Sequence, residues 1–262
     1  MSSNFPVVGL IQARLSSSRL PGKVLKTVLA KPLLLWQIER LRASRALDLL
    51  VVATSDSPED DPIAELCHEK GVLCYRGSLD DVLARMYCAA KAHGAGTVVR
   101  LTGDCPLLDP RVVDRMVEEH FSHGANVTSN SKKPVYPDGM DVEVCSFEAL
   151  ERAHLEASRP SEREHVTLYF YNHPDFFSVH HMSLKEHEQF PLLRLTVDEP
   201  QDFEKIRCIL EALAPTDPLF SLEDILVYLE QHPEVEALNA GIRRNEGLER
   251  SLQKEREQKL EK

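Results

Sequence analysis

The segment VVGLIQARLSSSRLPGK, residues 7–23, contains the features around which the chain is organised. Its apolar start predicts a buried strand, and a polar loop with a Pro-Gly turn follows. Open α/β sheets bind ligands at loops that leave the carboxyl ends of parallel strands. This loop carries three serines together with Arg14, Arg19 and Lys23, and charged donors make the strongest hydrogen bonds to phosphate oxygens. We therefore interpret the loop as a polyphosphate-binding loop; the alternative is a solvated surface loop.

Two common phosphate-binding motifs are excluded for this loop. A Walker loop needs a Gly, four residues and then Gly-Lys-Ser/Thr, but Ser17 stands at the first Gly position and Val24 follows Lys23. The dinucleotide-binding fingerprint needs three close glycines, and the loop contains only Gly22. The sequence therefore indicates neither a P-loop ATPase nor an ordinary nicotinamide enzyme.

Length, charge and cysteine usage narrow the class of protein. The 262 residues allow one large α/β domain or a domain with a sizeable appendage. The net charge of −11 disfavours general nucleic-acid binding, which requires a basic face. No stretch has the pattern of a signal peptide or a membrane span, and the six cysteines show no C-x-x-C spacing, as expected for reduced thiols. We expect a cytoplasmic protein that binds neither nucleic acid nor a membrane.

Strand and helix patterns alternate through the first half of the chain, with polar loops where the strands end. The predicted strands cover 7–11, 49–53, 72–75 and 97–101, and the predicted helices cover 33–45, 59–70, 79–93 and the segment after Asp109. Repeated β-α units imply parallel strands covered by helices. The predicted fold class is therefore α/β, with a mostly parallel, doubly covered sheet.

The alternation changes after about residue 125. We predict strands at 125–129, 141–144, 177–182 and 192–197, and helices at 147–157, 161–171, 200–213 and 222–231. Residues 243–262 are rich in charge and poor in apolar side chains, which indicates a solvated helix or a frayed tail. The sequence thus predicts a single domain over 1–242, with about 130–190 as a smaller α+β insertion for substrate binding or dimerisation, and a charged C-terminal tail over 243–262.

Asp104 and Asp198 each follow an apolar segment that predicts a strand. If both strands belong to one sheet, the two carboxylates meet at the edge that also holds the opening loop. Carboxylates together with nucleotide phosphates are the usual ligands of Mg²⁺. The alternative is that each Asp caps the helix that follows it. Because two copies occur beside a cationic loop, we favour a metal site.

Two charge-rich segments, 138–143 and 161–165, lie in the predicted insertion. Segments that interrupt a regular fold often carry substrate-specific groups. The candidate substrate-binding residues are Asp138, Asp141, Arg163 and His165. Residues 161–164 also fit a helix capping box, which is the alternative.

The histidines offer no metal site by their spacing along the chain. His180 and His181 are adjacent on a predicted alternating strand, so their side chains point to opposite faces. A zinc site is therefore not expected from the sequence.

The motifs together resemble the sugar cytidylyltransferases, which include the CMP-Kdo and CMP-acylneuraminate synthetases, and most of all the spore coat polysaccharide biosynthesis protein F branch. The resemblance begins with Gln12-Ala13-Arg14 and Ser18-Arg19-Leu20-Pro21-Gly22-Lys23. Further matching runs follow in the same order: residues 53–56, 76–78, 80–85, 100–106, 136–139, 161–167 and 197–200. The matches span about residues 7–210, so the tail is not covered.

The resemblance implies a nucleotidyltransferase fold of the glycosyltransferase-A kind, commonly homodimeric, that uses CTP and Mg²⁺. Carried over by position, Arg14, Lys23 and Asp104 would be catalytic, and Asp104 and Asp198 would hold the metal. The implied nucleotide-binding residues are Arg14, Ser18, Lys23, Arg76, Arg100 and Thr102. The chain has Thr102-Gly103-Asp104-Cys105 where the Kdo enzymes carry Gln-Gly-Asp-Glu, which leaves the base contacts and the identity of the sugar open.

The expected activity is transfer of CMP from CTP to a sugar hydroxyl with release of pyrophosphate, for surface polysaccharide or glycoconjugate synthesis. The expected sugar is an acidic 2-keto-3-deoxy sugar, and the expected partners are CTP and that small substrate. One alternative is a glycosyltransferase of similar architecture that consumes a nucleotide-sugar. The other is a nucleotide-binding protein without activity.

Overall fold

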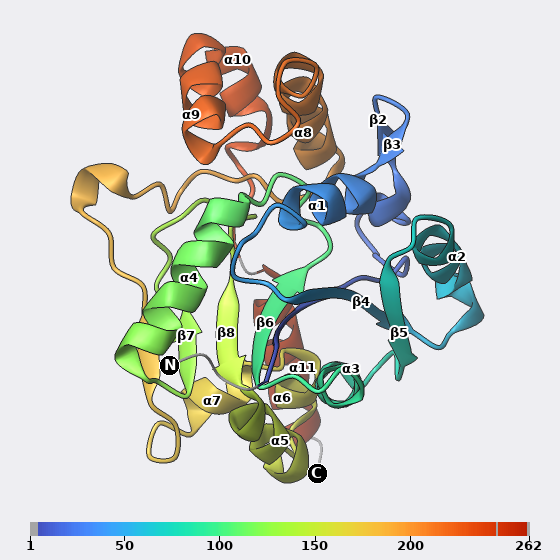
Figure 1. Cartoon of the computed structure of the whole chain (residues 1–262), viewed down its shortest axis with the longest axis vertical. Helices are drawn as coiled ribbons and strands as arrows, with labels where there is room; N and C mark the ends of the chain where they lie inside the picture. The colour runs from blue at the N-terminus through green and yellow to red at the C-terminus, as the bar shows by residue number, and fades with distance from the viewer. Residues whose placement is uncertain (1–4, 245, 261–262) are drawn as a thin grey trace.

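A seven-stranded sheet runs through the centre of the molecule, with strand order β5-β4-β1-β6-β8-β7-β9 (Figure 1). The computed structural model describes residues 5–244 and 246–260. The strands are β1 (Val7–Gln12), β4 (Leu49–Ser55), β5 (Leu73–Gly77), β6 (Thr97–Thr102), β7 (Val127–Ser129), β8 (Glu143–Ser146) and β9 (Val179–His181), and a separate two-stranded hairpin joins β2 (Thr27–Val28) to β3 (Lys31–Pro32).

Half of the sheet is parallel, as the repeated β-α units predict. Strand β1 pairs in parallel with both β4 and β6, and β4 pairs in parallel with β5. The order changes at β8, which is antiparallel to β6 and to β7, while β9 is parallel to β7. The predicted α/β class is confirmed, and the antiparallel strand β8 marks the beginning of the second half of the sheet.

Helices cover both faces of the sheet (Figure 1). The larger helices are α1 (Leu33–Leu41), α2 (Asp61–Glu69), α3 (Val82–Ala92), α4 (Pro110–His123), α5 (Phe147–Glu156), α8 (Pro200–Leu213), α9 (Leu222–Gln231) and α11 (Glu246–Leu260); the short ones are α6 (Pro160–Glu164), α7 (Leu168–Asn172) and α10 (Pro233–Glu236). Among the described residues, no helix is both long and apolar enough to cross a bilayer.

Two hydrophobic cores lie on opposite faces of the sheet because strand side chains alternate. Val7 and Ile11 of β1 belong to the core that includes α1, α2, α4, α8 and α9. Val8 and Leu10 belong to the core that includes α3, α5 and α7. All four side chains are buried, so β1 is covered on both faces. Its packed end determines where the following loop begins.

The predicted strand at 192–197 is wrong: this segment forms only an isolated bridge between Arg194 and Asp138. Its backbone bonds to two different loops instead of one strand. The Leu195 N–H donates to the Asp138 carbonyl at 2.6 Å, and the Val197 N–H donates to the Asp104 carbonyl at 2.9 Å. Asp198 therefore reaches Asp104 through a loop-to-loop contact and not through a shared strand edge.

The predicted helix at 161–171 is also interrupted. It forms two short helices, α6 and α7, and Val166 between them has a φ of 42°. A β-branched residue rarely adopts a positive φ, and the Val166 side chain is nonetheless buried in the second core. The break directs His165 and Thr167, which flank Val166, toward the cavity described below.

Candidate active site

The loop after β1 is bound to the segment that follows β4. The Leu15 N–H donates to the Asp60 carboxylate at 2.7 Å, and Asp60 also accepts hydrogen bonds from the Ser55 hydroxyl and backbone N–H. The Gly22 N–H closes the loop on the Leu15 carbonyl at 3.0 Å. Gly22 has a φ of 66°, a conformation that glycine adopts without strain. The loop therefore presents Lys23 from a defined turn.

Lys23 lies between the two predicted metal ligands. Its Nζ is 2.6 Å from Asp104 Oδ2 and 2.7 Å from Asp198 Oδ1, and its side chain is buried. Burial lowers the pKa of Lys23, but the two carboxylates outweigh burial and raise it. Burial likewise raises the pKa of Asp104, and Lys23 more than compensates, so that this pKa is lowered. At neutral pH Lys23 and Asp104 are therefore both charged.

The two carboxylates form a donor set that fits Mg²⁺. One oxygen of Asp104 and one of Asp198 converge on the same cation, the ammonium of Lys23. Hard carboxylate oxygens are the protein ligands that Mg²⁺ prefers. The predicted convergence of these two residues with the opening loop is therefore present in the structure. The Lys23 ammonium lies between the two carboxylates, where a bound cation would lie.

A buried arginine, Arg194, positions Asp198. Its guanidinium contacts Asp138 at 2.6 Å, Asp198 at 3.0 Å and Asp202 at 2.9 Å. Burial lowers the pKa of Arg194, but the surrounding carboxylates raise it overall. Asp202, which is fully buried, also accepts the backbone N–H groups of Asp198 and Glu199. The sequence analysis missed Arg194 because it lies in the middle of an apolar segment and no motif marks it.

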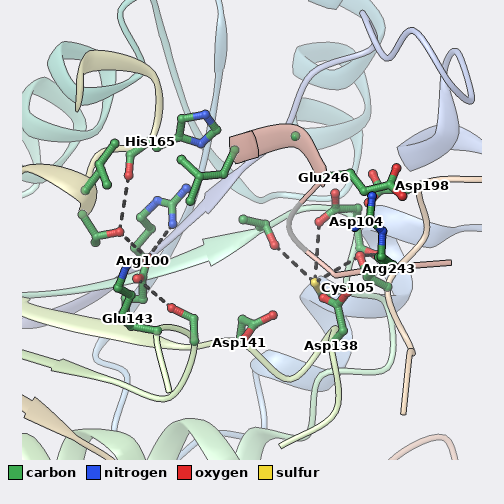
Figure 2. Close-up of a pocket in the computed structure, with 18 of the residues that line it drawn as sticks. Arg100, Asp104, Cys105, Asp138, Asp141, Glu143, His165, Asp198, Arg243 and Glu246 are labelled. Carbon is green, nitrogen blue, oxygen red and sulfur yellow. Dashed lines mark hydrogen bonds and ion pairs between the residues drawn. The ribbon is translucent and has the colours of Figure 1, made fainter. Parts of the chain in front are cut away.

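A cavity of about 300 Å³ opens beside Asp104 and Asp198. Figure 2 shows these two carboxylates at one end and Arg100, Glu143 and His165 at the other. The cavity is lined by Arg19, Arg100, Thr102, Asp104, Cys105, Ser131, Lys132, Asp138, Asp141, Glu143, His165, Thr167, Leu168, Tyr171, Thr196, Asp198, Arg243, Glu246, Gly247 and Leu248. It therefore brings together the ends of β6 and β8, the insertion and the start of α11.

Glu143 organises the end of the cavity away from Lys23. Its carboxylate contacts Arg100 at 2.5 Å and accepts hydrogen bonds from the hydroxyls of Ser131, Thr167 and Tyr171 at 2.8–2.9 Å. Glu143 is buried, and a buried carboxylate is stable when it is paired and fully hydrogen-bonded. Glu143 was predicted only as part of a charge-rich segment, and three of its four partners come from residues distant in sequence.

Asp138 and Asp141, two predicted substrate-binding residues, lie in the middle of the cavity wall (Figure 2). Burial raises the pKa of Asp141 to about 7, although an ion pair with Arg244 opposes the change. Gly139 between them has a φ of 104°, and a Cβ there would lie 2.5 Å from the Leu195 backbone carbon. Only glycine fits this close approach. Gly139 therefore lets the backbone between Asp138 and Asp141 pack directly on the segment that carries Asp198.

The predicted residues Arg14 and Arg163 line a second hollow, of about 440 Å³, with residues of α6 and the segment before α3. Arg163 forms an ion pair with Asp81 at 2.5 Å. Within residues 5–244 and 246–260, Arg14 makes no ion pair. Ser18 is exposed on the loop. Its position leaves it accessible to a ligand.

Arg76 is directed away from both hollows. Its guanidinium contacts Asp61 at 2.7 Å and the backbone carbonyls of Ser55 and Ser57 at 2.9 Å. Among the predicted nucleotide-binding residues, Arg100 and Thr102 therefore line the cavity, and Lys23 contacts two carboxylates of its wall. Arg14 lies in the second hollow, and Arg76 supports the loop after β4.

Cytidylyltransferase is the family that matches this chain, over residues 8–234. The spore coat polysaccharide biosynthesis protein SpsF of Bacillus subtilis is 34% identical over 233 residues, covering 87% of this chain and 95% of that protein. A 3-deoxy-manno-octulosonate cytidylyltransferase of Chlamydia trachomatis serovar A is 30% identical over 214 residues, covering 77% of this chain and 81% of that protein.

A solved structure agrees with these sequence similarities. A cytidylyltransferase from Leptospira borgpetersenii serovar Hardjo-bovis superposes with a TM-score of 0.85 at 30% identity, covering 92% of this chain and all of that one. The family match includes the loop after β1 and both Asp104 and Asp198, and it ends before α11. The chain therefore belongs to the cytidylyltransferase family and is a nucleotidyltransferase of the CTP-using kind.

Proposed function

We propose that the enzyme transfers CMP from CTP to a sugar hydroxyl and releases pyrophosphate. The observation that carries the proposal is the convergence of Lys23, Asp104 and Asp198 at one end of a cavity large enough for a small ligand. Such a transfer needs little covalent chemistry from the protein. It requires alignment of the hydroxyl with the α-phosphate and neutralisation of the charge on the phosphates.

Each part of the site has a proposed role. Lys23 and Arg14 neutralise the triphosphate, and Ser18 donates a hydrogen bond from the same loop. Arg100 and Thr102, at the end of β6, lie toward the nucleoside, while Arg76 acts from a distance by supporting the loop at 55–57. Arg14, Lys23 and Asp104 are the proposed catalytic residues.

Asp104 and Asp198 are the proposed ligands of Mg²⁺. When bound, the ion withdraws charge from the phosphoryl oxygens. Lys23 occupies the space between the same two carboxylates, so metal binding requires the ammonium to move. We infer that Lys23, which extends from the same loop as Arg14, would then pair with the triphosphate.

The sugar is proposed to bind where the insertion meets the cavity, next to Asp138, Asp141 and His165. Arg163 lines the second hollow, where its ion pair with Asp81 holds α6, and α6 leads directly to His165. We propose an acidic 2-keto-3-deoxy sugar. Two exposed cations that line the cavity, Lys132 and Arg243, form no ion pair within the described part of the chain and could receive its carboxylate. The name of the Chlamydia relative refers to a sugar of this class.

We further propose a cytoplasmic homodimer that acts in surface polysaccharide or glycoconjugate synthesis. The single domain over 1–242, with 130–190 as its substrate or dimerisation part, remains the proposed division of the chain. Sedimentation of the purified enzyme tests the dimer directly: a single monomer peak at micromolar concentration would refute it.

A panel of sugars tests the proposed reaction. The enzyme is incubated with CTP, Mg²⁺ and each member of a set of 2-keto-3-deoxy acids, neutral sugars and amino sugars, and the CMP-sugar is detected by mass spectrometry alongside pyrophosphate. We expect one acid to give both products in equal amounts, with Asp104→Asn as the inactive control. Release of free nucleotide from a nucleotide-sugar, without pyrophosphate from CTP, would instead identify a glycosyltransferase.

A further inference from the structure

Three side chains from two distant segments meet on the surface at the edge of the sheet. Glu119 and His123 lie one turn apart near the end of α4, and His180 lies in the edge strand β9. Glu119 Oε2 is 3.0 Å from His180 Nε2 and 3.4 Å from His123 Nδ1. The rings of His123 and His180 stack with their centroids 3.7 Å apart. Three potential ligand atoms therefore lie within 4.8 Å of one another.

Two of the three spacings between these atoms match a tetrahedral site. Zinc binds imidazole nitrogen and carboxylate oxygen at about 2.0–2.2 Å, so tetrahedral ligands lie about 3.3 Å apart. The two separations from Glu119 Oε2, 3.0 and 3.4 Å, are close to that value. The two imidazole rings are stacked with their planes 14° apart, so their in-plane lone pairs do not yet converge, and binding of one ion requires the rings to rotate about their side-chain bonds while the backbone stays in place. The end of α4 adds to the attraction because the C-terminus of a helix carries partial negative charge.

The cluster is separate from the proposed Mg²⁺ site in place and in chemistry. None of its three residues lines either hollow of the candidate active site. Two of its three ligands are imidazoles, which suit zinc and related transition metals, whereas Mg²⁺ prefers oxygen ligands. His123 is exposed and the other two side chains are half-buried, so an ion can enter and a water can complete its coordination.

We propose that Glu119, His123 and His180 bind one zinc-class divalent cation. Strand β9 pairs with its neighbour over only three residues, and α4 touches it through the Glu119–His180 contact and the stacked rings. The bound ion clamps β9 to α4. Because β9 leads into residues 182–194 and on to Arg194, the clamp steadies the segment that positions Asp198. Spacing along the chain does not indicate this site, because His180 is far from His123 in sequence.

Zinc titration of the full chain tests the site. The protein is treated with a chelator and titrated calorimetrically with ZnCl₂ in the presence of millimolar Mg²⁺, for wild type, His123→Ala, His180→Ala and His181→Ala. His181 is the matched control, because it neighbours His180 on β9 and its side chain points to the other face. We expect each variant at His123 or His180 to lose one equivalent of zinc or to bind it about 10-fold or more weakly, and His181→Ala to bind as wild type does.

Thermal unfolding supplies a second readout, since an ion that binds only the folded protein raises Tm. Zinc should raise Tm for wild type and His181→Ala, and less for the other two variants. Identical zinc binding by all four proteins overturns the proposal, as does zinc binding that disappears only when the cysteines are blocked. His123 is exposed, so His123→Ala provides a folded variant even if His180→Ala does not fold.

Discussion

Lys23 and its two carboxylates form the proposed chemical centre of the site, and they are held together by opposite charges. A buried ion pair that loses one partner leaves an uncompensated charge, which costs more than the pair itself contributes. Asp198 is also bound by Arg19 at 2.9 Å and by Arg194 at 3.0 Å. Its position is therefore set by three cations, whereas Asp104 depends on Lys23 alone among the basic side chains of the described residues.

Substitution of either carboxylate should remove activity and leave the fold intact. Asp104→Asn and Asp198→Asn keep the side-chain shape but delete a charged oxygen ligand, and we expect turnover to fall by on the order of 10²-fold or more. The measurement is the rate of pyrophosphate release over a range of Mg²⁺, with circular dichroism to confirm folding. Glu199→Gln is the matched control, because Glu199 neighbours Asp198 but does not itself line the cavity. Near-normal turnover in Asp104→Asn at limiting Mg²⁺ would exclude it as a metal ligand.

Lys23→Ala should lower kcat for CTP more than it raises KM. Charge on the leaving pyrophosphate grows as the bond breaks, and an interaction that strengthens in the transition state appears in kcat. Arg14→Ala should weaken CTP binding and also slow the reaction. Arg19→Lys is the control, since a lysine can still pair with Asp198. Unchanged constants in folded Lys23→Ala would mean that the loop does not contact the triphosphate.

Asp141 should make the protein less stable as the pH rises through neutrality. Its pKa is raised to about 7 in the folded protein, mainly by burial, and is near 3.9 in an unfolded chain. Between these values the folded state holds a proton that the unfolded state has lost, so stability falls as pH increases toward 7. Asp141→Asn removes this dependence. Urea unfolding at pH 5 and pH 8 should show that the variant gains stability relative to wild type at pH 8; an equal difference at both pH values would contradict the raised pKa.

At the residue scale, motif residues were predictable and their supporting residues were not. Lys23, Asp104 and Asp198 meet as the sequence predicts. Arg194 and Glu143 matter as much to the geometry, but each acts through partners brought together only by the fold. Spacing along the chain contains no information about such contacts.

At the element scale, α11 is the helix whose role the sequence leaves open, since a charge-rich tail indicates only a solvated helix or a frayed end. In the structure its first residues line the cavity. Ser251 contacts Glu164 of α6 at 2.9 Å, and Glu255 contacts Ser161. Arg244, just before α11, pairs with Asp141 and donates to the Tyr136 carbonyl at 3.1 Å. The segment therefore covers the side of the cavity proposed for the sugar.

Loss of this cover should affect the sugar more than CTP. Deletion of residues 243–262 should leave a folded enzyme, because both hydrophobic cores are built from residues before 243, and we expect a raised KM for the sugar. Arg244→Ala should reproduce part of the effect, and Arg256→Ala, an exposed arginine on α11, should not. Steady-state kinetics with each substrate varied in turn makes the comparison. Equal effects of the two arginine substitutions would show that α11 does not shape the site.

The predicted strands and helices with strong periodicity are present, and the errors occur where tertiary contacts decide the conformation. Residues 192–197 look like a strand because they are apolar, but they bond to the loops at Asp138 and Asp104. Residues 161–171 have helical spacing, but the chain turns at Val166 to bring His165 and Thr167 to the cavity. The periodicity of apolar residues therefore predicts which segments are buried, but it does not predict which backbone groups they hydrogen-bond to.

For the whole molecule, the sheet explains how residues proposed for two different substrates reach one cavity. The parallel strands β1 and β6 end side by side, with Gln12 opposite Thr102, and they deliver the loop with Lys23 and the turn with Asp104 to one edge. The antiparallel strand β8 then brings Glu143 opposite Arg100, which forms the far end of the cavity. The parallel half thus supplies the proposed triphosphate site, and the second half supplies the proposed sugar site.

The choice of nucleotide tests this assignment most directly. Pyrophosphate release is measured with a sugar substrate from the panel and with CTP, UTP, ATP or GTP at equal concentration and saturating Mg²⁺. We predict release with CTP well above the other three, and loss of that release in Asp104→Asn. Equal release from all four nucleotides, or release from CTP that does not require Asp104, would contradict a cytidylyl transfer at the Lys23–Asp104–Asp198 centre.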